Sequence, residues 1–215
     1  MILSVHIPKC GGTSFRHVLR EIYGAGLWLN YGAIFSQPQA RHHAVPPATR
    51  CIHGHFLADA FDDLVPQPEL VTWLRHPVER VVSNYFHFRR SPDLRDDCCR
   101  QLLERNLPLE AFAELDWMRN EATRYMAGKP AAAFRFIGIM ERFDESLRIF
   151  GATFGVAVPN RPPRENLNPD RTADAYRLPR STYDHILALN LTDLAAYELA
   201  AAALDAPQPA QANVG

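Results

Sequence analysis

The sequence has no apolar run near the roughly 18 residues that a membrane-spanning helix needs. No basic stretch followed by a long apolar segment begins the chain, so no signal peptide is visible. The formal net charge is only −1, from 23 basic and 24 acidic residues, which leaves no global field to draw the chain to nucleic acid or to a membrane surface. These absences predict a cytoplasmic protein with no transmembrane segment and no nucleic-acid partner.

Cysteine and lysine are both scarce. The four cysteines are Cys10, Cys51, Cys98 and Cys99. Two are adjacent and none has the CxxC spacing of a zinc or redox site, so they predict reduced thiols rather than a disulfide framework. Of the 23 basic residues 21 are Arg, and only Lys9 and Lys129 are Lys. A Lys at position 9 therefore suggests a need for a compact ammonium rather than a planar guanidinium.

Apolar residues are plentiful. They make up 47% of the 215 residues, and 12 Phe, 7 Tyr and 3 Trp are spread along the chain, which excludes disorder for most of its length. At roughly 100–200 residues per domain, the length predicts one domain. We assign it to residues 1–204 and expect the tail over 205–215, DAPQPAQANVG, to be disordered.

Short β-branched runs alternate with segments of helical periodicity. Strands are expected over 2–7, 51–56, 70–74 and 134–140. Helices are expected over about 13–23, 77–90, 141–154, 181–189 and 192–204, with a broken helical stretch over 97–126 and long loops over 36–49 and 158–172. Strands that alternate with helices predict an α/β fold built on a three-layer parallel sheet.

The segment PKCGGTS follows the first expected strand directly. Gly11 and Gly12 let the backbone approach an anion closely, and the amides after them point outward at a helix N-terminus. Thr13 and Ser14 add hydroxyl groups, and Lys9 adds positive charge. A glycine-containing turn without a ligand is the alternative, but this combination after a strand favours a phosphate-binding loop. The lysine precedes the glycines, unlike GxxxxGK[ST], which disfavours a kinase or NTPase.

His53 and His55 flank Gly54 in the second expected strand. Side chains at i and i+2 of a strand point to one face, so both imidazoles would line one pocket wall. Three roles compete: structural residues, metal ligands with Asp59 nearby, and a general base that titrates near neutrality, at about 6.5. The base is favoured over the structural role. Metal is last, because a third ligand at HxHxDH spacing is missing unless the loop with His42 and His43 folds back.

Two motifs together resemble those of sulfotransferases that use PAPS (3′-phosphoadenosine-5′-phosphosulfate). HIPKCGGTSF, residues 6–15, resembles their 5′-phosphosulfate loop, and TWLRHPVERVVSNYF, residues 72–86, resembles their second motif. The resemblance implies a P-loop-NTPase-like fold with added helices. It also implies that Arg75 and Ser83 hold the 3′-phosphate. From the first motif it implies cofactor contacts by Lys9, Cys10, Gly11, Gly12, Thr13, Ser14 and Phe15.

The HGH triplet looks similar to that of the carbohydrate 2-O-sulfotransferases, of heparan sulfate and uronyl type. That similarity implies that His53 is the base and that His55 assists the substrate. The segment ENLNPDRT resembles a late loop that closes over the nucleotide, with Asn168, Arg171 and Thr172 as cofactor contacts. The segment RNEATRYMAG resembles a family helix, which implies that Asn120, Thr123 and Arg124 face the cofactor or the acceptor, although a solvated helix explains it as well. Arg89 and Arg90 are further candidates for contact with an acidic saccharide.

The resemblance implies in-line transfer of a sulfuryl group from PAPS to a hydroxyl of an acceptor, taken to be a carbohydrate, with PAP as the product. A histidine would be the general base, Lys9 would be catalytic, and no metal would be needed. Two alternatives remain open. One is a nucleotide-binding protein without turnover, and the other is a metal-dependent hydrolase that uses the HxH pair.

Overall fold

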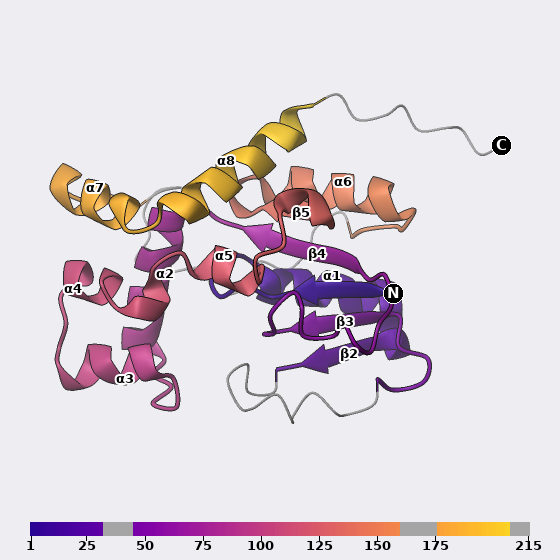
Figure 1. Ribbon diagram of the computed structural model, residues 1–215, viewed down its shortest axis with the longest axis horizontal. Coiled ribbons are helices and arrows are strands. Elements are labelled where there is room, and N and C mark those ends of the chain that lie inside the picture. The colour runs from indigo at the N-terminus through magenta and orange to yellow at the C-terminus, as the bar shows by residue number, and fades with distance from the viewer. Residues whose placement is uncertain (32–44, 160–175, 207–215) are drawn as a thin grey trace.

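A computed structural model describes residues 1–31, 45–159 and 176–206 of the chain (Figure 1). The strands are β1 (Ile2–Val5), β2 (Leu27–Asn30), β3 (Cys51–Gly54), β4 (Glu69–Leu74) and β5 (Phe134–Ile139). The helices are α1 (Gly12–Tyr23), α2 (Pro77–Arg90), α3 (Asp97–Glu104), α4 (Leu109–Ala113), α5 (Glu121–Tyr125), α6 (Phe143–Phe154), α7 (Arg180–Ala188) and α8 (Leu191–Asp205). The five strands form one parallel sheet in the order β2-β3-β1-β4-β5.

The central strand is β1, whose four residues are all buried. It pairs in parallel with β3 on one side and β4 on the other, so that Val5 lies opposite Gly54 and Thr72. Parallel strands end at the same edge of a sheet. The carboxyl ends of β1, β3 and β4 therefore meet at one edge. The glycine loop follows β1, Arg75 follows β4, and the HGH triplet spans the end of β3.

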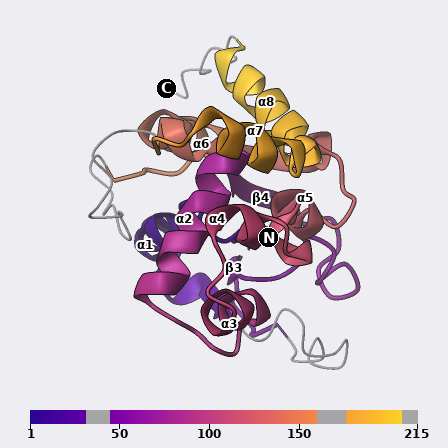
Figure 2. The ribbon, with the colours of Figure 1, turned by 90° about the vertical axis from the view of Figure 1, so that its left-hand side faces the viewer.

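Helices cover both faces of the sheet. α1 and α6 lie on one face, and α5 and α8 lie on the other (Figure 1 and Figure 2). On the first face Phe15 of α1 contacts Trp73 of β4 and Phe150 of α6, with ring centroids 5.2 and 5.1 Å apart. The predicted three-layer α/β arrangement is confirmed.

Four further helices, α2, α3, α4 and α7, gather beyond the carboxyl edge of the sheet, and we call them the helical cap (Figure 1). α2 starts with Pro77 at its first turn, where the missing N–H leaves no helical hydrogen bond unmade. Val81 of α2 packs in a second apolar cluster with Leu102, Phe112 and Ile186 from the other three helices. The helical cap therefore has its own core and stands over the edge at which the motifs meet.

Most predicted elements lie within a residue or two of the observed ones. β2 was not expected, and its four residues, Leu27–Asn30, are half-buried along the whole strand. β3 is two residues shorter than expected and ends at Gly54. A side chain there is excluded because a Cβ would lie 1.6 Å from the main-chain oxygen of Asn30 in β2.

Some predictions fall outside the described residues. These are most of both long loops and nearly all of the tail. The single domain over 1–204 stays a prediction. Within the described ranges no single helix is long and apolar enough to cross a membrane, and α7 and α8 meet that criterion only as a pair joined across a 90° bend.

Candidate active site

A cavity of about 350 Å³ separates the carboxyl edge of the sheet from the helical cap. Its volume falls in the range of about 300–1,000 Å³ that is typical of small-molecule sites. Eight of the predicted site residues meet there. They are Lys9, Gly11, Gly12, Thr13, Ser14, His55, Arg75 and Ser83. Lys9 and Ser83, which are 74 positions apart in the chain, thus line the same cavity, as the two sulfotransferase-like motifs predict.

The glycine loop adopts a conformation that few residues tolerate. Gly11 has a φ of 86° and forms the N-cap of α1, and a Cβ there would lie 2.4 Å from Sδ of Met140. Lys9 also has a positive φ, of 64°, which is uncommon for a residue with a side chain. Gly11, the N-cap residue, has no side chain with which to cap α1, and the first turn of the helix has no acidic residue. The main-chain donors and the positive end of the helix dipole thus face the cavity.

Gly12 has a second structural role that the sequence did not indicate. A Cβ at Gly12 would lie 2.0 Å from Cδ2 and 2.3 Å from Nε2 of His6. Because Gly12 has no side chain, the His6 ring can pack against the start of α1. His6 itself lines the cavity and is 7% exposed. It is a site residue that no motif singled out.

Lys9 is a cation in a confined place. Burial, together with the positive charges of Arg75 and Arg90, lowers its pKa from 10.5 to about 8. No ion pair joins Lys9 to a carboxylate in the parts of the chain that the structure describes. A partly buried ammonium beside other cations and a helix N-terminus makes a site that favours an anion.

Arg75 connects the glycine loop to α2. Its Nη1 donates to the main-chain oxygen of Lys9 at 3.3 Å, and its Nη2 donates to Oε2 of Glu79 at 3.2 Å. Ser83 lies further along α2 and faces the same cavity. A guanidinium can donate to two oxygens of a phosphate at once, so Arg75 and Ser83 are placed to bind a second anionic group beyond the loop.

The two histidines of the HGH triplet do not share one wall. His53 is 1% exposed, its Nδ1 lies 2.8 Å from Oγ of Ser4, and it is not among the described residues that line the cavity. Burial lowers the pKa of His53 to about 3. His55 does line the cavity, because β3 ends at Gly54 and the strand alternation does not extend to it. The expectation that both imidazoles face the pocket is therefore wrong, and His53 is not placed to reach a substrate.

No protein-family model matches the chain, and no curated protein matches it. Among solved structures, a sulfotransferase from Alicyclobacillus acidocaldarius matches with a TM-score of 0.54 and 17% identity, over 95% of this chain and 98% of that one. The chain has a sulfotransferase fold. Mouse sulfotransferase SULT7A1, complexed with PAP, matches with a TM-score of 0.46 and 19% identity, over 74% of this chain and 60% of its own length. The predicted fold class, a P-loop-NTPase-like sheet of sulfotransferase type, is confirmed, and the 2-O branch stays a prediction.

Some motif residues of this sulfotransferase fold are structural. The side chains of Cys10 and Phe15 are fully buried in the core, so only their main-chain atoms are available to a cofactor. Asn168, Arg171 and Thr172 lie outside the described residues.

The predicted acceptor residues point elsewhere. Arg89 donates to the main-chain oxygen of Leu107 at 3.0 Å, and Arg124 forms an ion pair with Asp116 at 2.9 Å. Arg90 is near enough to lower the pKa of Lys9 but does not line the cavity. Arg89, Asn120 and Arg124 are likewise not among the described residues that line the cavity. Their expected contact with an acidic saccharide is therefore not supported.

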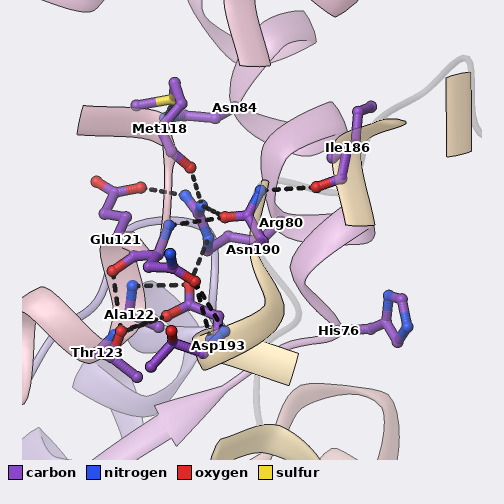
Figure 3. A network of polar contacts seen from close by, with 12 residues as sticks. His76, Arg80, Asn84, Met118, Glu121, Ala122, Thr123, Ile186, Asn190 and Asp193 are labelled. Carbon is purple, nitrogen blue, oxygen red and sulfur yellow. Dashed lines mark hydrogen bonds and ion pairs between the residues drawn. The ribbon is translucent and has the colours of Figure 1, made fainter. Parts of the chain in front are cut away.

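Asn120 instead takes part in a reciprocal capping arrangement between α5 and α8. Its Oδ1 accepts from the main-chain nitrogens of Thr192 and Asp193, at 3.0 and 3.1 Å. Asp193 in turn accepts from the main-chain nitrogens of Ala122 and Thr123, at 3.0 and 2.8 Å (Figure 3). Each helix start thus receives its cap from a residue about 70 positions away, which local sequence does not reveal.

Arg80 of α2 joins this network in the interior (Figure 3). Its side chain is fully buried and forms an ion pair with Glu121, and it donates to the main-chain oxygen of Met118 at 2.7 Å. Burial raises the pKa of Glu121 to about 7. Glu121 also lines the cavity, so the network connects α8 to the wall of the site.

Replacing Asp193 with alanine should lower the free energy of unfolding by about 2–4 kcal/mol, because two capping acceptors and a buried negative charge near Arg80 are lost together. Asp184→Ala is the matched control. It removes only an exposed pair with Arg180 and should change stability by less than about 0.5 kcal/mol. Urea denaturation measures both, and equal effects of the two variants would show that the capping arrangement contributes nothing.

Proposed function

We propose that the chain transfers a sulfuryl group from PAPS to a hydroxyl of an acceptor. The observation that carries the proposal is the meeting of two anion-binding features in one cavity. One is Lys9 beside the N-terminus of α1, and the other is Arg75 with Ser83 on the neighbouring segment. A nucleotide that carries anionic groups at both its 5′ and 3′ positions suits two such features better than a nucleotide with one anionic end.

PAPS supplies an activated sulfuryl group and PAP as its leaving group. The chain contributes Lys9 and the main-chain donors from Gly12 to Ser14 at the sulfated end. These donors are already oriented before binding, and they stabilise developing charge without reorganising. Arg75 and Ser83 are assigned to the 3′-phosphate. Lys9 is assigned to the charge that develops on the leaving oxygen.

His55 is the general base of this proposal, in place of His53. Its Nδ1 lies 2.7 Å from the main-chain oxygen of His6. A carbonyl oxygen can only accept, so Nδ1 carries the hydrogen and Nε2 keeps its lone pair. Burial lowers the pKa of His55 below 6.5, which keeps the ring neutral at physiological pH. A neutral imidazole with a free Nε2 at the cavity is in the correct state to accept a proton from a hydroxyl group.

The acceptor is proposed to be an uncharged carbohydrate. Trp117, Asp93 and Asp96 line the cavity on the side of the helical cap. An aromatic residue and carboxylate oxygens in the lining of one cavity suit a hydroxylated ring, because the carboxylates accept hydrogen bonds from hydroxyl groups. The same carboxylates would repel an acidic saccharide, and the arginines expected to attract one do not reach the cavity.

The arrangement of possible metal ligands gives little support to the alternative of a metal-dependent hydrolase. Across 1–31, 45–159 and 176–206, no three His, Cys, Asp or Glu side chains converge to hold a metal ion. His42 and His43, the other candidate ligands, lie outside these ranges.

Two measurements test the function. Calorimetry with PAP and AMP should show tighter binding of PAP, and labelled sulfate should pass from PAPS to one or more members of a panel of neutral and acidic glycans. Binding without transfer to any acceptor would favour the nucleotide-binding alternative. If PAP does not bind, the proposal is wrong.

Arg75→Ala should weaken PAP binding by about 10–100-fold, which corresponds to the loss of charge-assisted hydrogen bonds. AMP lacks the 3′-phosphate, so its dissociation constant should change much less. Arg75→Lys, which keeps the charge, should recover part of the PAP affinity, and Arg148→Ala on the exposed surface of α6 should leave it unchanged. Equal losses for PAP and AMP would mean that Arg75 only supports the loop through Lys9.

A further inference from the structure

Three imidazoles lie together where β1 and β3 end. The ring of His6 stacks on that of His55 with centroids 4.3 Å apart and on that of His53 with centroids 5.1 Å apart. His6 and His55 line the cavity. The proposed function uses His55 alone, so the cavity-facing ring of His6 has no role in it.

Contacts with β3 and with the start of α1 determine the position of His6. Its main-chain nitrogen donates to the oxygen of Gly54 at 2.8 Å, which continues the pairing of β1 with β3. Its Nε2 edge rests against Gly12, the first residue of α1, where a Cβ would lie 2.3 Å from Nε2. The edge of the ring thus lies at the same helix N-terminus to which the sulfated end of PAPS is assigned.

The other ring nitrogen of His6 has a partner that favours one tautomer. Nδ1 lies 3.0 Å from the hydroxyl of Tyr31, and that hydroxyl is also hydrogen-bonded by the side chain of Arg16. A guanidinium can only donate, so the Tyr31 oxygen accepts from Arg16, which polarises the Tyr31 O–H toward donating to Nδ1. Nδ1 is then the acceptor, and Nε2 carries the hydrogen.

His6 is also kept neutral. Burial holds its pKa well below 6.5, and the neighbouring His55, His53, Arg16 and Lys9 act in the same direction. Its ring is therefore a donor at Nε2 without being a cation. The adjacent His55 has the other tautomer. Its Nδ1 carries the hydrogen and donates it to the main-chain oxygen of His6, so its Nε2 has no hydrogen.

We propose that His6 is a neutral hydrogen-bond donor to the sulfuryl group, and that Tyr31 is a positioning residue that selects its Nε2–H tautomer. The proposal rests on the proposed function for the identity of the ligand. It assigns opposite tasks to two stacked rings: His6 donates to the group that is transferred, and His55 accepts the proton of the hydroxyl that receives it.

The tautomer is tested first, on the ligand-free wild-type protein. Nitrogen-15 NMR of the histidine rings should show His6 with a protonated Nε2 and a bare Nδ1. Tyr31→Phe keeps the ring of residue 31 but removes its hydroxyl, and it should shift His6 toward a mixture of tautomers. A wild-type His6 with a protonated Nδ1 would overturn the donor role, whatever nucleotide binds.

Binding provides the second readout, measured by calorimetry without acceptor. His6→Met should weaken PAPS binding by about 3–10-fold, the scale of one hydrogen bond, and should leave PAP binding unchanged because PAP has no sulfuryl group. His6→Gln, which keeps an N–H donor near the Nε2 position, should recover PAPS affinity, and Tyr31→Phe should lose part of it. Equal weakening of PAPS and PAP would overturn the proposal and make His6 structural. If the wild-type protein binds neither nucleotide, the proposed function itself fails, a result that the tautomer measurement separates from failure of the His6 assignment.

Discussion

Replacing His55 with alanine should lower kcat by about 10²–10⁴-fold, the range for loss of a positioned general base. The affinity for PAP should stay nearly unchanged, because His55 is assigned to the acceptor hydroxyl and not to the nucleotide. His55 lines the cavity, and its Nδ1 lies 2.7 Å from the main-chain oxygen of His6, which leaves Nε2 as the nitrogen that can accept a proton. Steady-state kinetics with PAPS and a glycan acceptor, together with calorimetry of PAP, measure the two quantities.

His53→Ala is the matched comparison, since it removes the same side chain from a buried position two residues away. It should reduce stability, because a buried ring and its contact with Ser4 are lost. The turnover of the remaining folded protein should be much closer to that of the wild type than in the His55 variant. If kcat falls further in His53→Ala than in His55→Ala, at an equal folded fraction, then His53 is the general base and the assignment to His55 is wrong.

The three histidines also predict how stability depends on pH. The folded protein holds the pKa of His6, His53 and His55 below 6.5, so the unfolded chain binds more protons than the folded chain at acidic pH. Stability is therefore lost progressively as the pH falls below about 6.5, the pKa of an unperturbed histidine. For His53 the loss continues down to its folded pKa of about 3.

The parts of the site that local sequence encodes were predictable. A β-branched run, two glycines and a helix with apolar spacing determine where β1 ends and α1 begins, so Lys9 and the loop amides were found from the sequence. Arg75 and Ser83 were found because the second motif resembles a known one, and the helix that starts at Pro77 has a clear first-turn signal. The parallel sheet then brings these segments to one edge.

The parts that depend on distant contacts were not predictable. The same-face rule failed for His53 and His55 because β3 ends between them, at a glycine that must fit against Asn30 of the unexpected strand β2. Asn120 was taken for an acceptor residue, but the amides that it caps belong to a helix about 70 residues later. No pattern within one segment contains that information.

Positive and negative side chains lie on different sides of the cavity. Lys9 and Arg75 lie at the loop, whereas Asp93, Asp96 and Glu121 come from the helical cap and α5. Glu121 is partnered by the buried Arg80, and Asp93 by Arg95 at 2.7 Å, so part of the negative charge is balanced locally. Lys9 has no such partner among the described residues. Its charge is therefore the one that a bound anion is expected to balance.

Lys9→Ala should accordingly lower kcat by about 10²–10³-fold, the scale of losing one oriented charge stabiliser. The pH dependence gives a sharper test. With a pKa of about 8 in the free protein, Lys9 loses its charge as the pH rises, so kcat/KM for PAPS should fall above about pH 8. Because His55 is neutral down to below pH 6.5, the fall on the acid side should begin lower than for an ordinary histidine.

The Lys9→Arg variant tests whether positive charge at position 9 is enough or whether the compact shape of an ammonium is also needed. A guanidinium stays protonated throughout this range, so the decline above pH 8 should disappear in the variant. Its plateau should still lie below that of the wild type, because a larger planar guanidinium does not replace a compact ammonium in a partly buried place that Arg75 and Arg90 already make positive. An unchanged decline in Lys9→Arg would assign that titration to another group. Wild-type turnover in Lys9→Ala would remove Lys9 from the reaction.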